Sequence, residues 1–245
     1  MLTQYRLTLK PEGLPQPRPE LAYRLYATLL AQSPSAFAET AHEDAVTPVS
    51  QFLTLRDQGA LLWTVNLLGE RSEAALADVL DSLERLELER GGRVLVTERN
   101  RKSIPDADTL FALAERSGSL HRMEFRTPTA FKSRGQYLNL PTTRLVLQSL
   151  IRKWNGSVTE CLIEDEDGEG LEALAAGISC KSFRLYDRAY HLKGSTIPGF
   201  VGNLVLENRL DGFHRLLANA LFLFSSYAGV GIKTTLGMGG VERIE

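Results

Sequence analysis

The order in which strand-like and helix-like segments follow one another constrains the fold of this chain more than any single residue does. In the first half, apolar residues either alternate with polar ones or recur every three to four positions. The order of these patterns predicts strand, helix, strand, strand, helix and strand. The helix that begins at Pro19 tolerates the missing N–H of its first turn, and Ser72 suits the N-cap of the next helix. The predicted segments are residues 3–9, 19–30, 52–55, 61–68, 72–86 and 93–97.

The same order of elements returns in the second half, although the sequences of the two halves do not visibly repeat. A short helix at residues 106–117 and a break at Gly118 separate the halves, and the acidic, glycine-containing stretch at residues 164–170 predicts a surface loop. We therefore expect an α+β fold of two tandem ferredoxin-like (βαββαβ) units, residues 1–117 and residues 118–245. The second set of predicted elements is residues 120–127, 140–154, 179–192, 199–207, 211–227 and 240–244.

The overall charge of the chain does not indicate a nucleic-acid partner. The formal net charge is -2 and the sequence pI is about 6.1, so any site for RNA must come from local clustering of Lys and Arg. The two cysteines, Cys161 and Cys180, lack metal-ligand spacing and predict free, buried thiols in a reducing cytoplasm. No signal-peptide core and no apolar run of membrane-spanning length is present in the sequence, so we expect a cytoplasmic protein without a membrane partner.

The segment from Gly229 to Gly240 carries the most distinctive local sequence, Gly-Val-Gly-Ile-Lys-Thr-Thr-Leu-Gly-Met-Gly-Gly. It is not a nucleotide-binding P-loop, because Ile232 precedes Lys233 and the segment follows a helix instead of a strand; a dinucleotide fingerprint fails for the same positional reason. Two interpretations remain. The glycines either let exposed N–H groups cradle a phosphate, or simply join the last helix to the last strand.

The arrangement of a helix, Gly-hydrophobic-Gly, a Lys-Thr stretch and Gly-Met-Gly resembles the C-terminal signature of the CRISPR-repeat-processing endoribonucleases, the Cas-six family of the repeat-associated RNA-binding (RAMP) superfamily. The resemblance covers the whole chain, including a Tyr-bearing first helix, a His shortly after it, and residues 197–200 before the last helix. It implies a metal-independent endoribonuclease that needs no cofactor and matures guide RNAs from CRISPR repeat RNA. It also implies that the glycine-rich segment binds RNA, through Gly229, Gly231, Lys233, Thr234, Gly237 and Gly239.

Such enzymes cleave by attack of the RNA's own 2′-OH, which leaves a 2′,3′-cyclic phosphate and a 5′-OH. A histidine suits the proton transfers, since its ordinary pKa lies near pH 6.5. The resemblance implies that His42 is the catalytic histidine and Tyr26 its partner. The alternatives are a solvent-exposed His42, a core Tyr26 with Tyr23 competing for its role, and His191 as the second catalytic candidate. The Lys that often follows the histidine is absent from residues 47–50, so that Lys193, Lys132 or an Arg would replace it.

Basic residues interleaved with aromatic ones mark a second candidate surface, because cations position phosphates and rings stack on unpaired bases. The alternative is a solvated strand face. The precursor and mature guide RNA are the expected partners, and a multi-subunit CRISPR effector complex and a homodimer stay open. Competing functions are a non-catalytic RNA-binding subunit of such a complex and an unrelated metabolic enzyme. The candidate RNA-binding cations are Lys132, Arg134, Lys181, Arg184, Arg188 and Lys193.

Overall fold

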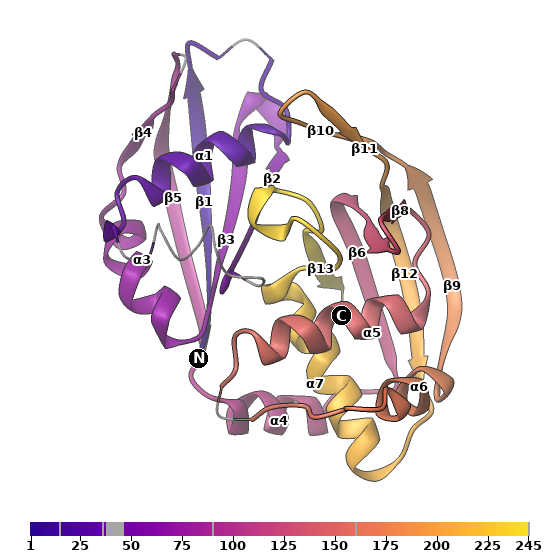
Figure 1. Ribbon diagram of the computed structural model, residues 1–245. Coiled ribbons are helices and arrows are strands. Elements are labelled where there is room, and N and C mark those ends of the chain that lie inside the picture. The colour runs from indigo at the N-terminus through magenta and orange to yellow at the C-terminus, as the bar shows by residue number, and fades with distance from the viewer. Residues whose placement is uncertain (15, 36, 38–46, 90, 160, 245) are drawn as a thin grey trace.

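The N-terminal unit is an antiparallel sheet with helices on one face (Figure 1). The computed structural model describes residues 1–14, 16–35, 37, 47–89, 91–159 and 161–244. The strand order is β2-β3-β1-β5-β4, in which β4 extends the edge of a ferredoxin-like sheet. The elements are β1 (Leu2–Glu12), α1 (Leu21–Leu30), β2 (Val49–Leu55), β3 (Leu61–Leu68), α3 (Glu70–Ser82), β4 (Arg85–Glu87) and β5 (Arg93–Ile104).

The C-terminal unit repeats this architecture with strand order β13-β6-β12-β9. Helix α4 (Ala107–Glu115) precedes it, and helix α6 (Glu169–Ala176) and two small hairpins are inserted in it. The hairpins are β7 (Phe131–Ser133) with β8 (Gln136–Leu138), and β10 (Tyr190–Leu192) with β11 (Ser195–Ile197). The main elements are β6 (Leu120–Thr129), α5 (Thr143–Asn155), β9 (Ile178–Asp187), β12 (Phe200–Asn208), α7 (Gly212–Ala228) and β13 (Val241–Ile244). The predicted fold class, two tandem ferredoxin-like units, is confirmed.

Several sequence predictions were wrong in detail. The N-cap of α3 is Gly69 instead of Ser72, and the helix ends at Ser82, so residues 85 and 86 belong to β4. The acidic stretch includes the start of α6, where both carboxylate oxygens of Asp165 accept from the N–H groups of Gly170 and Leu171 and so satisfy the helix N-terminus. Strand β5 extends to Ile104 because its exposed cationic residues still pair with β1. Cys161 and Cys180 are free but exposed, not buried.

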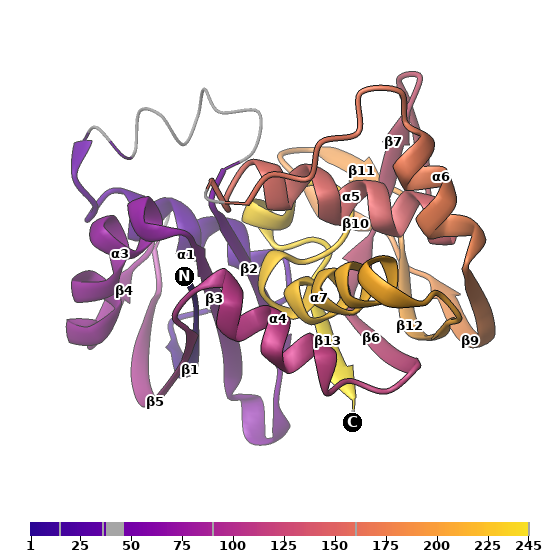
Figure 2. The ribbon, with the colours of Figure 1, turned by 90° about the horizontal axis from the view of Figure 1, so that it is seen from below.

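Alternation along β1 gives the N-terminal sheet two different faces. Tyr5, Leu7 and Leu9 are fully buried against α1 and α3, whereas Gln4 and Arg6 point to the opposite face, toward the C-terminal unit. Figure 2 shows α7 lying between the two units with α4 beside it. Leu110 of α4 belongs to the C-terminal core, which continues across the junction.

Polar side chains of the N-terminal sheet bind the end of α7. Gln4 Nε2 donates to Asn66 Oδ1 at 2.8 Å and to the carbonyl of Ser226 at 3.0 Å. Asn66 Nδ2 donates to Ser50 Oγ at 2.9 Å, and that hydroxyl donates to the carbonyl of Tyr227. The last carbonyls of a helix have no partner within the helix, so these bonds fix α7 to the first unit at the point where the glycine-rich segment begins. Across the described residues, every helix is too short or too polar to cross a membrane.

Candidate nucleic-acid interface at the domain junction

The glycine-rich segment, residues 229–240, is packed into the junction of the two units. A Cβ on Gly231 would lie 2.3 Å from the carbonyl oxygen of Ala130, and one on Gly239 would lie 2.1 Å from that of Val230. Both glycines also have positive φ, +81° and +67°. Close approach of protein backbone therefore accounts for the glycines at positions 231 and 239.

Most N–H groups of this segment donate within the protein. The N–H groups of Val230 and Ile232 donate to the carbonyls of Gly239 and Ala130, each at 2.9 Å. The N–H of Gly240 donates to the hydroxyl of Thr127 at 2.9 Å. These amides are not free to cradle a phosphate. The part of the segment that faces outward is its middle, residues 231–236, which lines a cavity.

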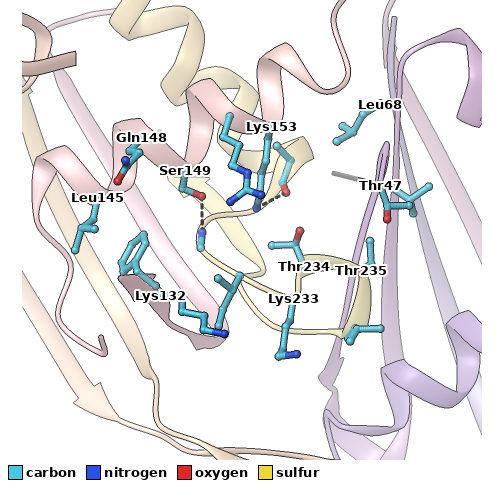
Figure 3. Close-up of a pocket in the computed structure, with 17 residues that line it drawn as sticks. Thr47, Leu68, Lys132, Leu145, Gln148, Ser149, Lys153, Lys233, Thr234 and Thr235 are labelled. Carbon is cyan, nitrogen blue, oxygen red and sulfur yellow. Dashed lines mark hydrogen bonds between the residues drawn. The ribbon is translucent and has the colours of Figure 1, made fainter. Parts of the chain in front are cut away.

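That cavity, of about 470 Å³, lies between the two units and is lined by cations (Figure 3). They come from three elements: Lys132 from β7, Arg152 and Lys153 from α5, and Lys233 from the glycine-rich segment. No Asp or Glu occurs among the described residues that line it. A recess with cations and low-dielectric walls concentrates positive potential, so the cavity is suited to a phosphodiester backbone.

Lys153 forms the inner wall of the cavity. Its side chain is buried, and its Nζ donates to the carbonyls of Ala228 and Gly229, at 3.1 Å each. Burial lowers the pKa of this ammonium from its ordinary value to about 7. One helical turn earlier on α5, Ser149 Oγ accepts from the N–H of Gly231 at 2.8 Å. Figure 3 shows both side chains reaching the glycine-rich segment from the same side of α5.

The cavity gathers some of the residues predicted to bind RNA and leaves others at a distance. Lys132, Gly231, Lys233 and Thr234 line it together. The other predicted glycines, Gly229, Gly237 and Gly239, are buried inside the segment.

Arg134 and Lys193 lie outside the cavity, exposed at the turns of the β7–β8 and β10–β11 hairpins, where both have positive φ. The ammonium of Lys193 lies 4.8 Å from the ring centre of Tyr23 on α1, so this hairpin also bridges the two units.

Lys181 and Arg184 lie on β9, the edge strand of the second sheet, and Arg188 directly follows that strand; the three form a separate group. Lys181 pairs with Glu207 at 3.3 Å, while Phe183 and Tyr186 on the same strand are 68% and 59% exposed. Exposed rings beside cations are suited to stacking on unpaired bases, whereas the cavity is suited to a phosphodiester backbone.

Of the two residues predicted to be catalytic, the structure describes only Tyr26. His42 lies outside the described residues. Tyr26 is 4% exposed within the core of the first unit, and its hydroxyl has no hydrogen-bond partner among the described residues. Burial raises the pKa of this phenol far above its ordinary value. The geometry gives Tyr26 a packing role, whereas Tyr23, half-buried, faces the domain junction.

His191, the second candidate, is exposed on β10, where its Nδ1 lies 3.2 Å from the hydroxyl of Thr196. Sequence reasoning missed the roles of both Ser149 and Lys153. Their spacing of four residues put them on one helix face, but their partner lies at least 75 residues further along the chain.

Two ferredoxin-like units in tandem, with a glycine-rich segment after the last helix, are the architecture that the resemblance to the RAMP superfamily implied. The profile of the family described as "CRISPR-associated endoribonuclease Cas6" matches residues 123–241. Over these residues the chain is similar to the Cas6 family, as the resemblance in its sequence implied.

Similar proteins of that description occur in Mycobacterium tuberculosis and Streptococcus thermophilus. The first is 28% identical over 227 residues, 91% of this chain and 71% of the relative. The second is 27% identical over 231 residues, 94% of this chain and 93% of the relative.

Two solved structures cover nearly the full length of both chains. A Cas6 product complex is 28% identical with a TM-score of 0.81, over 100% of this chain and 99% of the other. A Cas6 substrate mimic complex is 28% identical with a TM-score of 0.74, over 99% of both chains.

Proposed function

We propose that this protein is an endoribonuclease that cleaves CRISPR repeat RNA into mature guide RNAs, with the scissile phosphate bound at the cavity between the two units. The observation that carries this proposal is the convergence of four cations from three elements on a recess without a carboxylate among its described lining residues. The product and substrate mimic complexes of Cas6 proteins add support, because this chain matches both along their length.

The chemistry requires no metal. The 2′-oxygen forms a bond to the adjacent phosphorus and gives up its proton to a base, while the bond from phosphorus to the 5′-oxygen breaks and that oxygen receives a proton. The products are a 2′,3′-cyclic phosphate and a 5′-OH. Lys132, Arg152 and Lys233 stabilise the extra negative charge of the phosphorane, which develops only as the bond forms.

His42 is the proposed general acid or base. Thr47, five residues further along the chain, lines the cavity. One of the similar solved structures is a histidine-to-alanine mutant of a Cas6 protein, which fits an essential histidine in that relative. Lys132 is the proposed substitute for the lysine absent after His42, since it lines the cavity and Lys193 does not.

RNA on either side of the cleaved bond would follow the exposed cations. Arg134 and Lys193 flank the cavity at the two hairpin turns, and Arg184 on β9 and Arg188 just after it extend the path. The exposed Phe183 and Tyr186 would stack on unpaired bases there. The glycine-rich segment contributes the side chain of Lys233, and its buried glycines act by shaping the segment that presents it.

The test uses purified protein and its cognate repeat RNA in the presence of EDTA. Wild-type protein is expected to cut at one position, and mass spectrometry should find a 2′,3′-cyclic phosphate on the upstream fragment. His42→Ala and a substrate with a 2′-deoxy nucleotide at the cut should both abolish cleavage while RNA binding persists.

Tight binding without cleavage by the wild type would identify a non-catalytic RNA-binding subunit of an effector complex instead. The absence of a lysine in residues 47–50 is the feature that favours this second candidate. No RNA binding at low salt would exclude both.

A further inference from the structure

The carbonyls at the end of α7 receive donors from both units. Those of Ser226 and Tyr227 accept from the N-terminal sheet, and those of Ala228 and Gly229 accept from Lys153 of α5. A cation at a helix C-terminus is favoured by the helix dipole, and here it is also buried. The direction in which the chain leaves α7 is therefore set by Lys153.

Ser149 adds a second point of attachment two residues further along the segment. Its hydroxyl accepts from the N–H of Gly231. Between them, the two side chains bind Gly229 and Gly231, the first and third residues after the helix, and Lys233 follows two residues later. Lys233 itself has positive φ, +56°, a conformation that a non-glycine residue adopts only where its surroundings hold it.

The far side of the same segment is tied to the first unit. Gln51 Nε2 donates to the carbonyl of Thr235 at 2.8 Å, and its Oε1 accepts from the indole of Trp63 at 2.8 Å. Lys233 thus lies between an attachment to each unit. If the α5 attachment is lost, the segment stays bound at residue 235 and through the N–H groups of Val230 and Ile232, but Gly229 and Gly231 lose the side-chain partners that hold the stretch leading to Lys233.

We propose that Lys153, assisted by Ser149, is a positioning residue for RNA cleavage that acts by fixing the place of Lys233 in the cavity. The proposal rests on the function proposed above. Lys153 touches the carbonyls of the protein, and its effect on the reaction passes through the glycine-rich segment. A displacement of about 1 Å in a group that stabilises the transition state can lower the rate roughly a hundredfold. RNA affinity, in contrast, comes from many exposed cations whose positions do not depend on Lys153.

The experiment measures the single-turnover cleavage rate, the RNA Kd and hydrogen exchange of residues 229–235 in four proteins. These are the wild type, Lys153→Met, Ser149→Ala and the control Arg144→Met. Arg144 is exposed on the same helix and pairs with Glu172, so its loss removes a cation from α5 without touching the segment.

We expect Lys153→Met to cleave at least tenfold more slowly than the wild type, with RNA Kd changed by less than about threefold and faster exchange at Gly231 and Ile232. Ser149→Ala should also lower the cleavage rate without changing the RNA Kd, but by a smaller factor. Because this variant keeps the buried Lys153, it serves as the test if Lys153→Met does not fold. Arg144→Met should match the wild type in all three measurements.

Wild-type cleavage rates in folded Lys153→Met, or in Ser149→Ala where Lys153→Met does not fold, would overturn the proposal, as would a loss of rate matched by an equal loss of affinity. A wild-type protein that binds RNA but does not cleave it would refute the proposed function instead, and hydrogen exchange would still report whether Lys153 holds the segment.

Discussion

Two tyrosines three residues apart on α1 meet different surroundings. Tyr26 belongs to the core of the first unit, while Tyr23 packs at the junction against the buried cluster that contains Tyr190 and Met238, with the ammonium of Lys193 over its ring. The sequence offers both as candidates, because periodicity alone does not say which side of a helix faces a second unit. At the residue scale, the position of the partner element decides the role.

Tyr26→Phe removes only a buried hydroxyl that has no partner among the described residues. We expect cleavage within threefold of the wild type and unchanged or slightly higher thermal stability, since a buried, unpaired polar group is unfavourable. Measurement of the cleavage rate and Tm checks this. A large loss of cleavage rate with unchanged RNA affinity would support a catalytic role for Tyr26.

His121 provides a pH dependence of stability. Its Nε2–H donates to Asn219 Oδ1 at 2.8 Å in the core of the second unit, and burial lowers its pKa to about 4. Between pH 6.5 and pH 4 the unfolded histidine binds a proton that the folded one does not, so the free energy of unfolding falls as pH falls through this window. The loss is on the order of 3 kcal/mol.

Urea titrations of the wild type and of His121→Gln at pH 7.5 and pH 4.5 test this. Glutamine keeps a donor for Asn219 but does not titrate, so its stability should change less with pH. Equal pH dependence in the two proteins would contradict the assignment.

At the scale of elements, the order of strands and helices was predictable because hydrophobic periodicity is local. The errors in predicting α6 and β5 also have local causes. Charged residues in the first turn of α6 are typical of a loop, and the exposed cations of β5 interrupt the alternation of polar and apolar residues. The cationic cavity could not be predicted. Its four cations come from parts of the sequence separated by about a hundred residues, and only packing brings them together.

Gly231→Ala and Gly135→Ala distinguish close packing from backbone conformation. The two glycines have nearly equal φ, +81° and +82°, but only the Cβ at residue 231 would meet backbone, whereas nothing lies within 4 Å of the Cβ at residue 135. We expect Gly135→Ala to cost about 1 kcal/mol and Gly231→Ala at least twice that, measured by chemical denaturation. Equal costs would mean that conformation alone requires both glycines.

At the scale of the whole molecule, RNA affinity should depend on salt in proportion to the phosphates neutralised, despite a net charge of -2. Lys132→Ala and Lys233→Ala should each reduce the slope of log K against log salt by about 0.7 for single-stranded RNA. Arg85→Ala is the matched control, because Arg85 lies on β4 at the far edge of the first sheet. A slope unchanged in both lysine variants would place the RNA elsewhere.

The attachment of residues 229–240 to both units has a consequence for biosynthesis. The first unit is complete, and free of the tunnel, long before this segment is made, yet Gly240 packs against Phe52 and the carbonyl of Thr235 against Gln51. At about 5–20 residues per second, roughly 6–25 s separate the translation of residue 117 from that of residue 240. During that interval the polar face of the first sheet lacks the contacts with residues 229–240. This surface of a nascent chain would therefore be exposed to chaperones and proteases.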